Sequence, residues 1–304
     1  MKNIIIDTDA GHDDALAILL LIKSRAFNIK AITTVAGNST LENVTRNAFF
    51  IRDFAARTDI PIYSGYEKPL KRELVLAVVH GASGLDGMNL ANIQYKLTHD
   101  ADKQLIRLIK ENPNKISLLT IGPLTNIARA FLKEPKLPGL LKQIVIMGGA
   151  IDCCGNKNRV AEFNIFVDPE AADIVFRAKV PKVLIPIDVC SDMPLFLSDF
   201  EKLHGSELYA LIMKMMREFI KGIEAYEGTK GALVYDAIAA YYLLNPKAFV
   251  LKPMDIVIET KGEYTRGMTV VEKRIAAKKM HNAEVAVKVN REKFVSDLIK
   301  MLRK

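Results

Sequence analysis

Four aspartates lie within eight positions near the start of the chain, and no other feature constrains its fold as strongly. They are Asp7, Asp9, Asp13 and Asp14, in the stretch IIIDTDAGHDDALAILL (residues 4–20). A β-like apolar run precedes them and a helix-like apolar run follows them. In an open parallel sheet, the junction where a strand ends and a helix begins lies at the edge where ligand sites form.

This amount of negative charge needs a physical reason. One or two aspartates would cap the helix and complement its dipole, but four exceed what capping requires. Carboxylates held close together repel one another or take up protons, so a cluster persists most readily around a cation. Because the ligands are hard oxygens, the pattern favours Ca²⁺ or Mg²⁺ over zinc.

Short runs rich in Ile and Val alternate with helix-like segments through the first two thirds of the chain. The strand-like runs are residues 3–6, 29–35, 116–121, 143–147 and 182–187, and the helix-like segments include 40–56, 123–132 and one that begins at 168–170. This alternation predicts an α/β fold with an open, mostly parallel, doubly wound sheet and helices on both faces.

The pattern changes after Pro194. Helix-like segments at 207–226 and 235–244 precede strand-like segments at 255–259, 268–271 and 284–289. We interpret them as an added helical layer and closing elements of the same domain. Because no repeat or Ser/Gly-rich linker marks a boundary, residues 1–304 are predicted to form a single domain.

Composition excludes several classes of protein. No apolar stretch approaches the ~20 residues of a membrane span, and the first apolar run is broken too early for a signal peptide, so we expect a cytoplasmic protein without a membrane partner. The net charge of +8 is spread along the chain, and its densest basic stretch, residues 271–281, lacks interleaved aromatic residues. We therefore expect no nucleic-acid partner. Three cysteines, at positions 153, 154 and 190, are predicted to be reduced thiols.

Three known kinds of site could explain acidic residues after a first strand. An EF-hand fails, because counting from Asp7 places Ile18 where that loop requires a glutamate. A Mg²⁺-dependent phosphotransferase of the haloacid dehalogenase type would use a similar DTD motif, and it stays as an alternative. A nicotinamide-binding domain is weaker, because no G-x-G-x-x-G motif follows the strand.

The stretch DTDAGHDDALA resembles the signature D-x-D-[PT]-G-x-D-D-A-x-A of the inosine-uridine preferring nucleoside hydrolases. Further blocks of that family follow in the same order and cover nearly the whole chain: TTVAGN (33–38), HGASGL (80–85), GPLTNIA (122–128), MGG (147–149), AEFNIFVDPEAA (161–172) and YDAIAAYYLLNP (235–246). The resemblance implies an open α/β sheet with a Rossmann-like core and no dinucleotide.

The resemblance also implies a Ca²⁺ ion held by Asp9, Asp14, Asp236 and the main-chain carbonyl of Ile121. It implies a nucleoside as the small-molecule substrate, bound through the ribose. The substrate-binding residues implied are Asp13, Asn38, His80, Met147, Asn156, Glu162, Asn164 and Asp236.

The activity implied is hydrolysis of the N-glycosidic bond of a purine or pyrimidine ribonucleoside, giving ribose and a free base. Asp9 would act as the general base, with Asp13 and Asn164 beside the reacting sugar. Tyr235 stands where several family members have a histidine that protonates the departing base, and a tyrosine, with an ordinary pKa near ~10, is a weaker acid. A non-catalytic nucleoside-binding protein is therefore a further alternative. Family members are commonly homo-oligomers, so a dimer or tetramer is expected.

Overall fold

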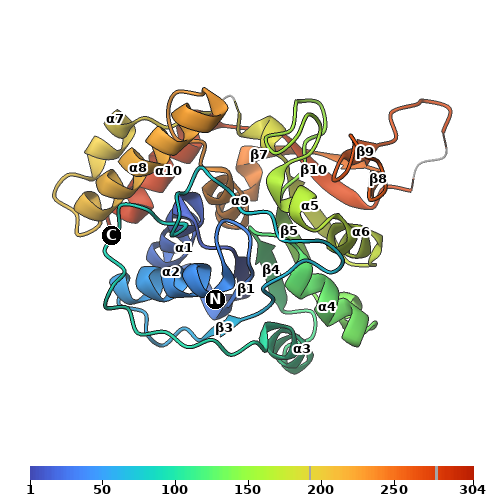
Figure 1. The fold of residues 1–304 in the computed structure, drawn as a ribbon, viewed down its shortest axis with the longest axis horizontal. Helices are drawn as coiled ribbons and strands as arrows, with labels where there is room; N and C mark the ends of the chain where they lie inside the picture. Colours follow the sequence, from blue (N-terminus) through green and yellow to red (C-terminus); the bar gives the residue numbers. More distant parts are fainter. Residues whose placement is uncertain (192, 278–279) are drawn as a thin grey trace.

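The structure is a computed structural model that describes residues 1–191, 193–277 and 280–304 (Figure 1). Eight strands form one sheet in the order β3-β2-β1-β4-β5-β6-β10-β7, in which neighbouring strands pair in parallel except for the edge pair β10–β7. Their bounds are β1 (Lys2–Thr8), β2 (Phe27–Thr34), β3 (Ile62–Ser64), β4 (Ile116–Thr120), β5 (Gln143–Met147), β6 (Lys182–Ile185), β7 (Phe249–Met254) and β10 (Ala283–Val289). This topology confirms the predicted open, mostly parallel α/β sheet.

Helices cover both faces of the sheet (Figure 1). The helices are α1 (His12–Ser24), α2 (Leu41–Phe54), α3 (Ala101–Glu111), α4 (Thr125–Lys133), α5 (Phe163–Val167), α6 (Pro169–Arg177), α7 (Leu197–Phe200), α8 (Tyr209–Glu227), α9 (Tyr235–Leu244) and α10 (Arg291–Leu302). One apolar core lies among α1, α2, α8, α9 and α10, and a second lies among α3, α4 and α6.

Strand β1 shows why the strands lack alternating polarity. Ile4 and Ile6 enter the first core, whereas Ile5 enters the second, and all three are fully buried. A strand covered by helices on both faces needs apolar side chains at successive positions. Helix α1 is likewise buried from His12 to Ile22, so it is apolar around most of its circumference.

The C-terminal third forms the added helical layer. Helices α8 and α9 match the predicted segments closely, and β10 joins the main sheet beside β6. The two short strands β8 (Ile256–Ile258) and β9 (Thr269–Val271) form a separate antiparallel pair beside α6, where Ile256 and Ile258 pack into the second core (Figure 1). They close no edge of the main sheet.

Several element predictions need correction. Pro123 precedes α4, which begins at Thr125, so it does not occupy a first helical turn. Sequence analysis missed β3, α3, β7 and α10. Strand β7 contains Pro253, which is tolerated because β7 is an edge strand. Helix α10 could have been predicted from the sequence, because Asn290 caps it and its buried residues recur at helical spacing.

Two further predictions concern a membrane span and the basic stretch. In the part of the chain that the structure describes, no helix combines the length and apolarity needed to cross a bilayer. Lys278 and Lys279, in the basic stretch 271–281, lie outside the described residues.

Candidate active site

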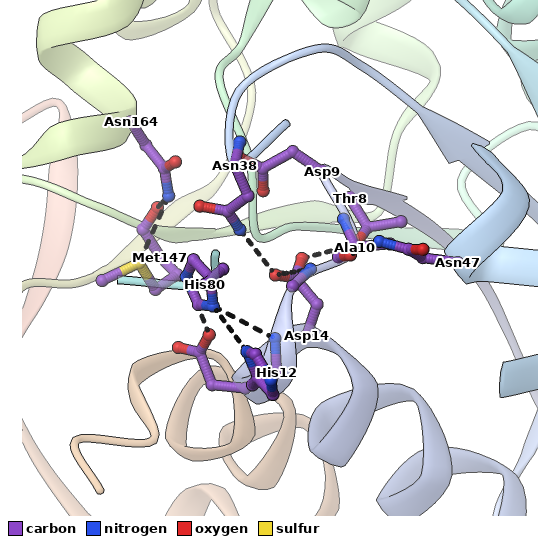
Figure 2. Close-up of polar contacts among 12 residues, drawn as sticks. Thr8, Asp9, Ala10, His12, Asp14, Asn38, Asn47, His80, Met147 and Asn164 are labelled. Carbon is purple, nitrogen blue, oxygen red and sulfur yellow. Dashed lines mark hydrogen bonds and ion pairs between the residues drawn. The ribbon is translucent and has the colours of Figure 1, made fainter. Parts of the chain in front are cut away.

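The acidic stretch forms the turn between β1 and α1, at the carboxyl end of the central strands. All four of its aspartates are buried, and Asp9 and Asp14 lie together beside Asn38 (Figure 2). Asp7 supports the turn from below, because its Oδ1 accepts hydrogen bonds from Thr33 Oγ1 and Asn126 Nδ2. These bonds give Asp7 a structural role in the turn.

Asp14 is held by three donors. Gly11 N–H donates to Asp14 Oδ2 at 2.8 Å, which closes the first turn of α1, and Thr8 Oγ1 donates to Asp14 Oδ1. The third donor is Asn38 Nδ2, at 3.0 Å from Oδ2 (Figure 2). These bonds fix the carboxylate in one orientation, although burial still raises its pKa.

Asp9 has one satisfied and one unsatisfied oxygen. Its Oδ2 accepts the backbone N–H of Asn38 at 2.8 Å, whereas its buried Oδ1 has no partner among the described residues. Gly37 and Gly122 leave space for the Asp9 side chain. A Cβ on Gly37 would lie 2.2 Å from Oδ2, and a Cβ on Gly122 would lie 2.9 Å from Oδ1. A buried, unpaired carboxylate oxygen is costly unless a cation or a donor is supplied.

Asp236 reaches the same place from a distant part of the chain. It lies in the first turn of α9, and carboxylate oxygens of Asp13, Asp14 and Asp236 all lie within 4.8 Å of one another. Burial, followed by repulsion between these carboxylates, raises the pKa of Asp9, Asp13 and Asp236 well above its ordinary value. The carboxylates of Asp13, Asp14 and Asp236 therefore fit a hard divalent cation, which would neutralise the cluster. Asp9 is not one of the three, although its charge interacts with those of Asp13 and Asp14.

A cavity of about 260 Å³ opens directly above this cluster. Its lining includes every residue predicted to bind substrate, with Ile121 and Tyr235: Asp13, Asn38, His80, Met147, Asn156, Glu162, Asn164 and Asp236. Asp9 and Asp14 do not line it, and both are completely buried. The structure thus places the predicted substrate-binding residues around one cavity. Of the predicted metal ligands, Asp14 and Asp236 lie in the close carboxylate group with Asp13, whereas Asp9 does not.

Glu162 organises one wall of the cavity. As the N-cap of α5, its carboxylate accepts the backbone N–H groups of Asn164 at 2.8 Å, Ile165 at 3.2 Å and Gly149 at 3.0 Å. Burial raises the pKa of Glu162 to about 7 despite these bonds. Asn164 is held on its other side by contact of Nδ2 with the carbonyl and sulfur of Met147 (Figure 2).

His80 is a buried residue that lines the cavity. Its ring lies nearly parallel to those of His12 and Phe219, which also stack on each other, with centroids 5.5 Å and 5.1 Å from the His80 ring, and its Nδ1 accepts the His12 backbone N–H at 3.2 Å. Burial lowers the pKa of both histidines, to about 4 for His12. His80 Nε2 lies 3.8 Å from Asp13 Oδ1, so the imidazole faces the acidic cluster.

The far end of the cavity was not fully anticipated from sequence. Phe219, Ile223, Tyr226 and Glu227 of α8 form it, and Tyr235 adjoins them. Helical periodicity alone made Phe219 and Ile223 indistinguishable from core residues. Tyr241, by contrast, is buried away from the cavity, where its hydroxyl donates to Asp297.

Comparison with known proteins decides the family. The protein family described as "Inosine-uridine preferring nucleoside hydrolase" matches this chain over residues 4–296. The chain belongs to this nucleoside hydrolase family. It is 37% identical to the pyrimidine-specific ribonucleoside hydrolase RihA of Salmonella arizonae, over 99% of this chain and 98% of that protein.

Solved nucleoside hydrolases share the fold. The plant nucleoside hydrolase PpNRh1 has a TM-score of 0.92 and 30% identity, covering 99% of each chain. A purine-preferring ribonucleoside hydrolase from Gardnerella vaginalis also has a TM-score of 0.92, with 27% identity over 99% of this chain and 98% of that one. This nucleoside hydrolase is accordingly an enzyme of the N-glycosidase class, and the haloacid dehalogenase alternative is not favoured.

Proposed function

We propose that this nucleoside hydrolase is a Ca²⁺-dependent enzyme that cleaves purine or pyrimidine ribonucleosides into ribose and a free base. One observation carries the proposal: the buried carboxylates of Asp13, Asp14 and Asp236 meet directly beneath a nucleoside-sized cavity. The family match supports the substrate class, and the chemistry of the donor set supports the metal.

Asp9, Asp14, Asp236 and the main-chain carbonyl of Ile121 would hold the calcium ion. The unpaired Oδ1 of Asp9 is the strongest argument for this assignment, because nothing else among the described residues satisfies it. When bound, Ca²⁺ supplies positive charge that keeps the carboxylates ionised and makes a water molecule easier to deprotonate.

The polar wall would bind the ribose. Asp13, Asn38 and Asn164 line the cavity beside the acidic cluster, where they can hydrogen-bond the sugar hydroxyl groups. Asn156 and Glu162 would hold the end that carries the 5′-hydroxyl, and Met147 would pack against the sugar ring. Glu162 and Asn164 are preorganised for this task by the backbone bonds described above.

Asp9 would act as the general base that takes a proton from the attacking water. As the bond from C1′ to the base breaks, positive charge develops on the ribosyl ring. The carboxylate of Asp13 and the amide oxygen of Asn164 would stabilise that charge from fixed positions. Tyr235 would donate a hydrogen bond to the departing base, and His80 would pack beside it.

Three other predictions extend this proposal. Strands from both ends of the sequence share one sheet, which supports a single domain over residues 1–304. A homodimer or homotetramer and a cytoplasmic location stay predictions from the sequence and from family resemblance. Light scattering of the purified protein measures its assembly directly.

The deciding experiment measures free base, inorganic phosphate and ligand binding in parallel, with inosine, adenosine, uridine and cytidine as substrates. Release of a free base and ribose, dependent on Ca²⁺, would support the proposal. Binding without release of a base would instead indicate a nucleoside-binding protein. The four relative rates also define the base preference.

A further inference from the structure

The two ends of the cavity differ in chemistry. The end above the acidic cluster carries carboxylates and amides that suit a sugar, whereas the end formed by α8 is mostly apolar and aromatic. A flat nucleobase fits the second end, which contains Phe219, Ile223 and Tyr226. One carboxyl group interrupts this apolar surface, and it belongs to Glu227.

Glu227 occupies a position that disfavours its ionised form. It is the last residue of α8, before Gly228 ends the helix with φ 69°, and the last turn contains no basic residue. The partial negative charge at a helix C-terminus opposes a carboxylate there. Among the residues that the structure describes, the Glu227 side chain has no hydrogen bond or ion pair, and burial raises its pKa.

Most of the other titratable groups that line the cavity are acidic, so they offer no opposite charge to an ionised Glu227. Asp13, Glu162 and Asp236 are acidic, and Tyr235 from α9 is close enough for the Glu227 charge to affect its titration. Lys157 also lines the cavity, and its ammonium lies 5.7 Å from the centroid of the Phe163 ring. The described structure contains no ion pair between Lys157 and Glu227.

The other titratable groups near the base are less suited to donate a proton. His80 Nδ1 already accepts a hydrogen bond from the His12 backbone N–H. Its Nε2 faces Asp13, at the end of the cavity proposed for the sugar, and not the end proposed for the base. Tyr235 is a phenol in a buried environment, which favours its neutral form and makes it a reluctant acid. Glu227 lines the cavity but is only half-buried, so it can recover a proton from solvent.

We propose that Glu227 is the proton donor to the departing base. This inference rests on the proposed hydrolase activity. The glycosidic electron pair stays with the base nitrogen as the C1′–N bond breaks, and a proton passes from the Glu227 carboxyl group to a ring nitrogen of the base. Water forms the new C1′–O bond and gives its proton to Asp9. Solvent then returns a proton to Glu227 and removes one from Asp9, so atoms and charge balance.

The test compares two leaving groups in the full-length protein with calcium. A natural nucleoside such as uridine needs protonation of its base, whereas 4-nitrophenyl β-D-ribofuranoside releases a stable phenolate without it. Glu227→Gln keeps the shape of the side chain but cannot donate a proton as an acid. We expect kcat for uridine or inosine, whichever is the better substrate, to fall by about 100-fold or more. The rate with the nitrophenyl riboside should stay within about threefold of wild type.

Glu224→Gln is the matched control, because Glu224 is exposed on the same helix and does not line the cavity. It should leave both rates unchanged. In wild type, kcat for the nucleoside should fall on the alkaline side as Glu227 ionises, and Glu227→Gln should remove that limb of the pH profile.

Two results would overturn the inference while leaving the hydrolase activity intact. One is an equal loss on both substrates, which would make Glu227 a residue of structural importance only. The other is a selective loss on the nucleoside in Tyr235→Phe but not in Glu227→Gln, which would identify Tyr235 as the donor. If wild type released neither base nor nitrophenolate, the proposed hydrolase activity would itself be wrong.

Discussion

The side-chain amide of Asn38 donates a hydrogen bond to the carboxylate of Asp14, with 3.0 Å between Nδ2 and Oδ2. The backbone N–H of the same residue donates to Asp9 at 2.8 Å, so one residue after β2 fixes two carboxylates that follow β1. These two strands are neighbours in the sheet, and their carboxyl ends therefore place the three residues together.

Asn38→Ala removes the bond to Asp14 and keeps the backbone bond to Asp9. Losing a hydrogen bond to a charged group costs about 1.5–3 kcal/mol, so we expect roughly a 10- to 100-fold weaker response to calcium. The measurement is the calcium concentration that gives half-maximal hydrolysis. Asn28→Ala is the control, because the Asn28 side chain is exposed and, in the described structure, hydrogen-bonds only to Asn3. Equal calcium responses in both variants would contradict a role for Asn38.

Asp9→Asn removes the proposed general base without changing the shape of the side chain. We expect kcat to fall by about 10²- to 10⁴-fold, the usual contribution of a general base. Folding should survive, since the substitution also removes one of several mutually repelling carboxylates. Steady-state kinetics and thermal unfolding test both parts. A variant with a near-normal rate would remove Asp9 from the mechanism.

Gly37→Ala should displace the Asp9 carboxylate through a steric clash. The added Cβ would lie 2.2 Å from Asp9 Oδ2, so either the carboxylate or the loop must move. We expect activity to fall by at least about tenfold, because a displacement near 1 Å is sufficient to disturb catalysis. Gly139→Ala is a matched control, since its Cβ would meet nothing within 4 Å. Similar rates for the two variants would show that the position of Asp9 is not critical.

Removing calcium should make stability depend on pH. In the folded, metal-free protein the pKa values of Asp9, Asp13 and Asp236 are raised, so the folded state binds more protons than the unfolded state above about pH 4. The free energy of unfolding should therefore fall as pH rises from about 5 to 8. Calcium should flatten this dependence, because the ion stabilises the charged carboxylates. Thermal unfolding in chelator and in excess calcium tests this, and parallel curves would count against the metal site.

Glu162→Ala should weaken both the fold and substrate binding. It removes the N-cap of α5 and leaves the buried N–H of Gly149 without its acceptor. The loss of the cap alone costs about 1–2 kcal/mol, measurable by urea unfolding. Because Asn164 loses its anchor, KM should rise as well. Glu111→Ala, at an exposed position in α3, provides the comparison for stability. A stability loss without any change in KM would separate Glu162 from substrate binding.

Sequence patterns were sufficient to predict the central strands of the sheet and the acidic turn. Runs such as residues 143–147 are apolar at successive positions because helices cover both faces, and β5 has those same bounds. The Asp168-Pro169 pair likewise marks the start of α6 correctly, since the Asp168 side chain accepts the Ala171 N–H. Local signals of this kind depend on neighbouring residues alone.

The sequence by itself therefore determined the fold class, the family and the identity of the clustered carboxylates. Only the tertiary structure decided that Asp236 meets Asp13 and Asp14, that His80 stacks with His12 and Phe219, and that Glu227 is the carboxyl group at the apolar end of the cavity. These relationships join residues far apart in the chain. Packing of α8 and α9 over the sheet creates them, and no short-range pattern encodes such a contact.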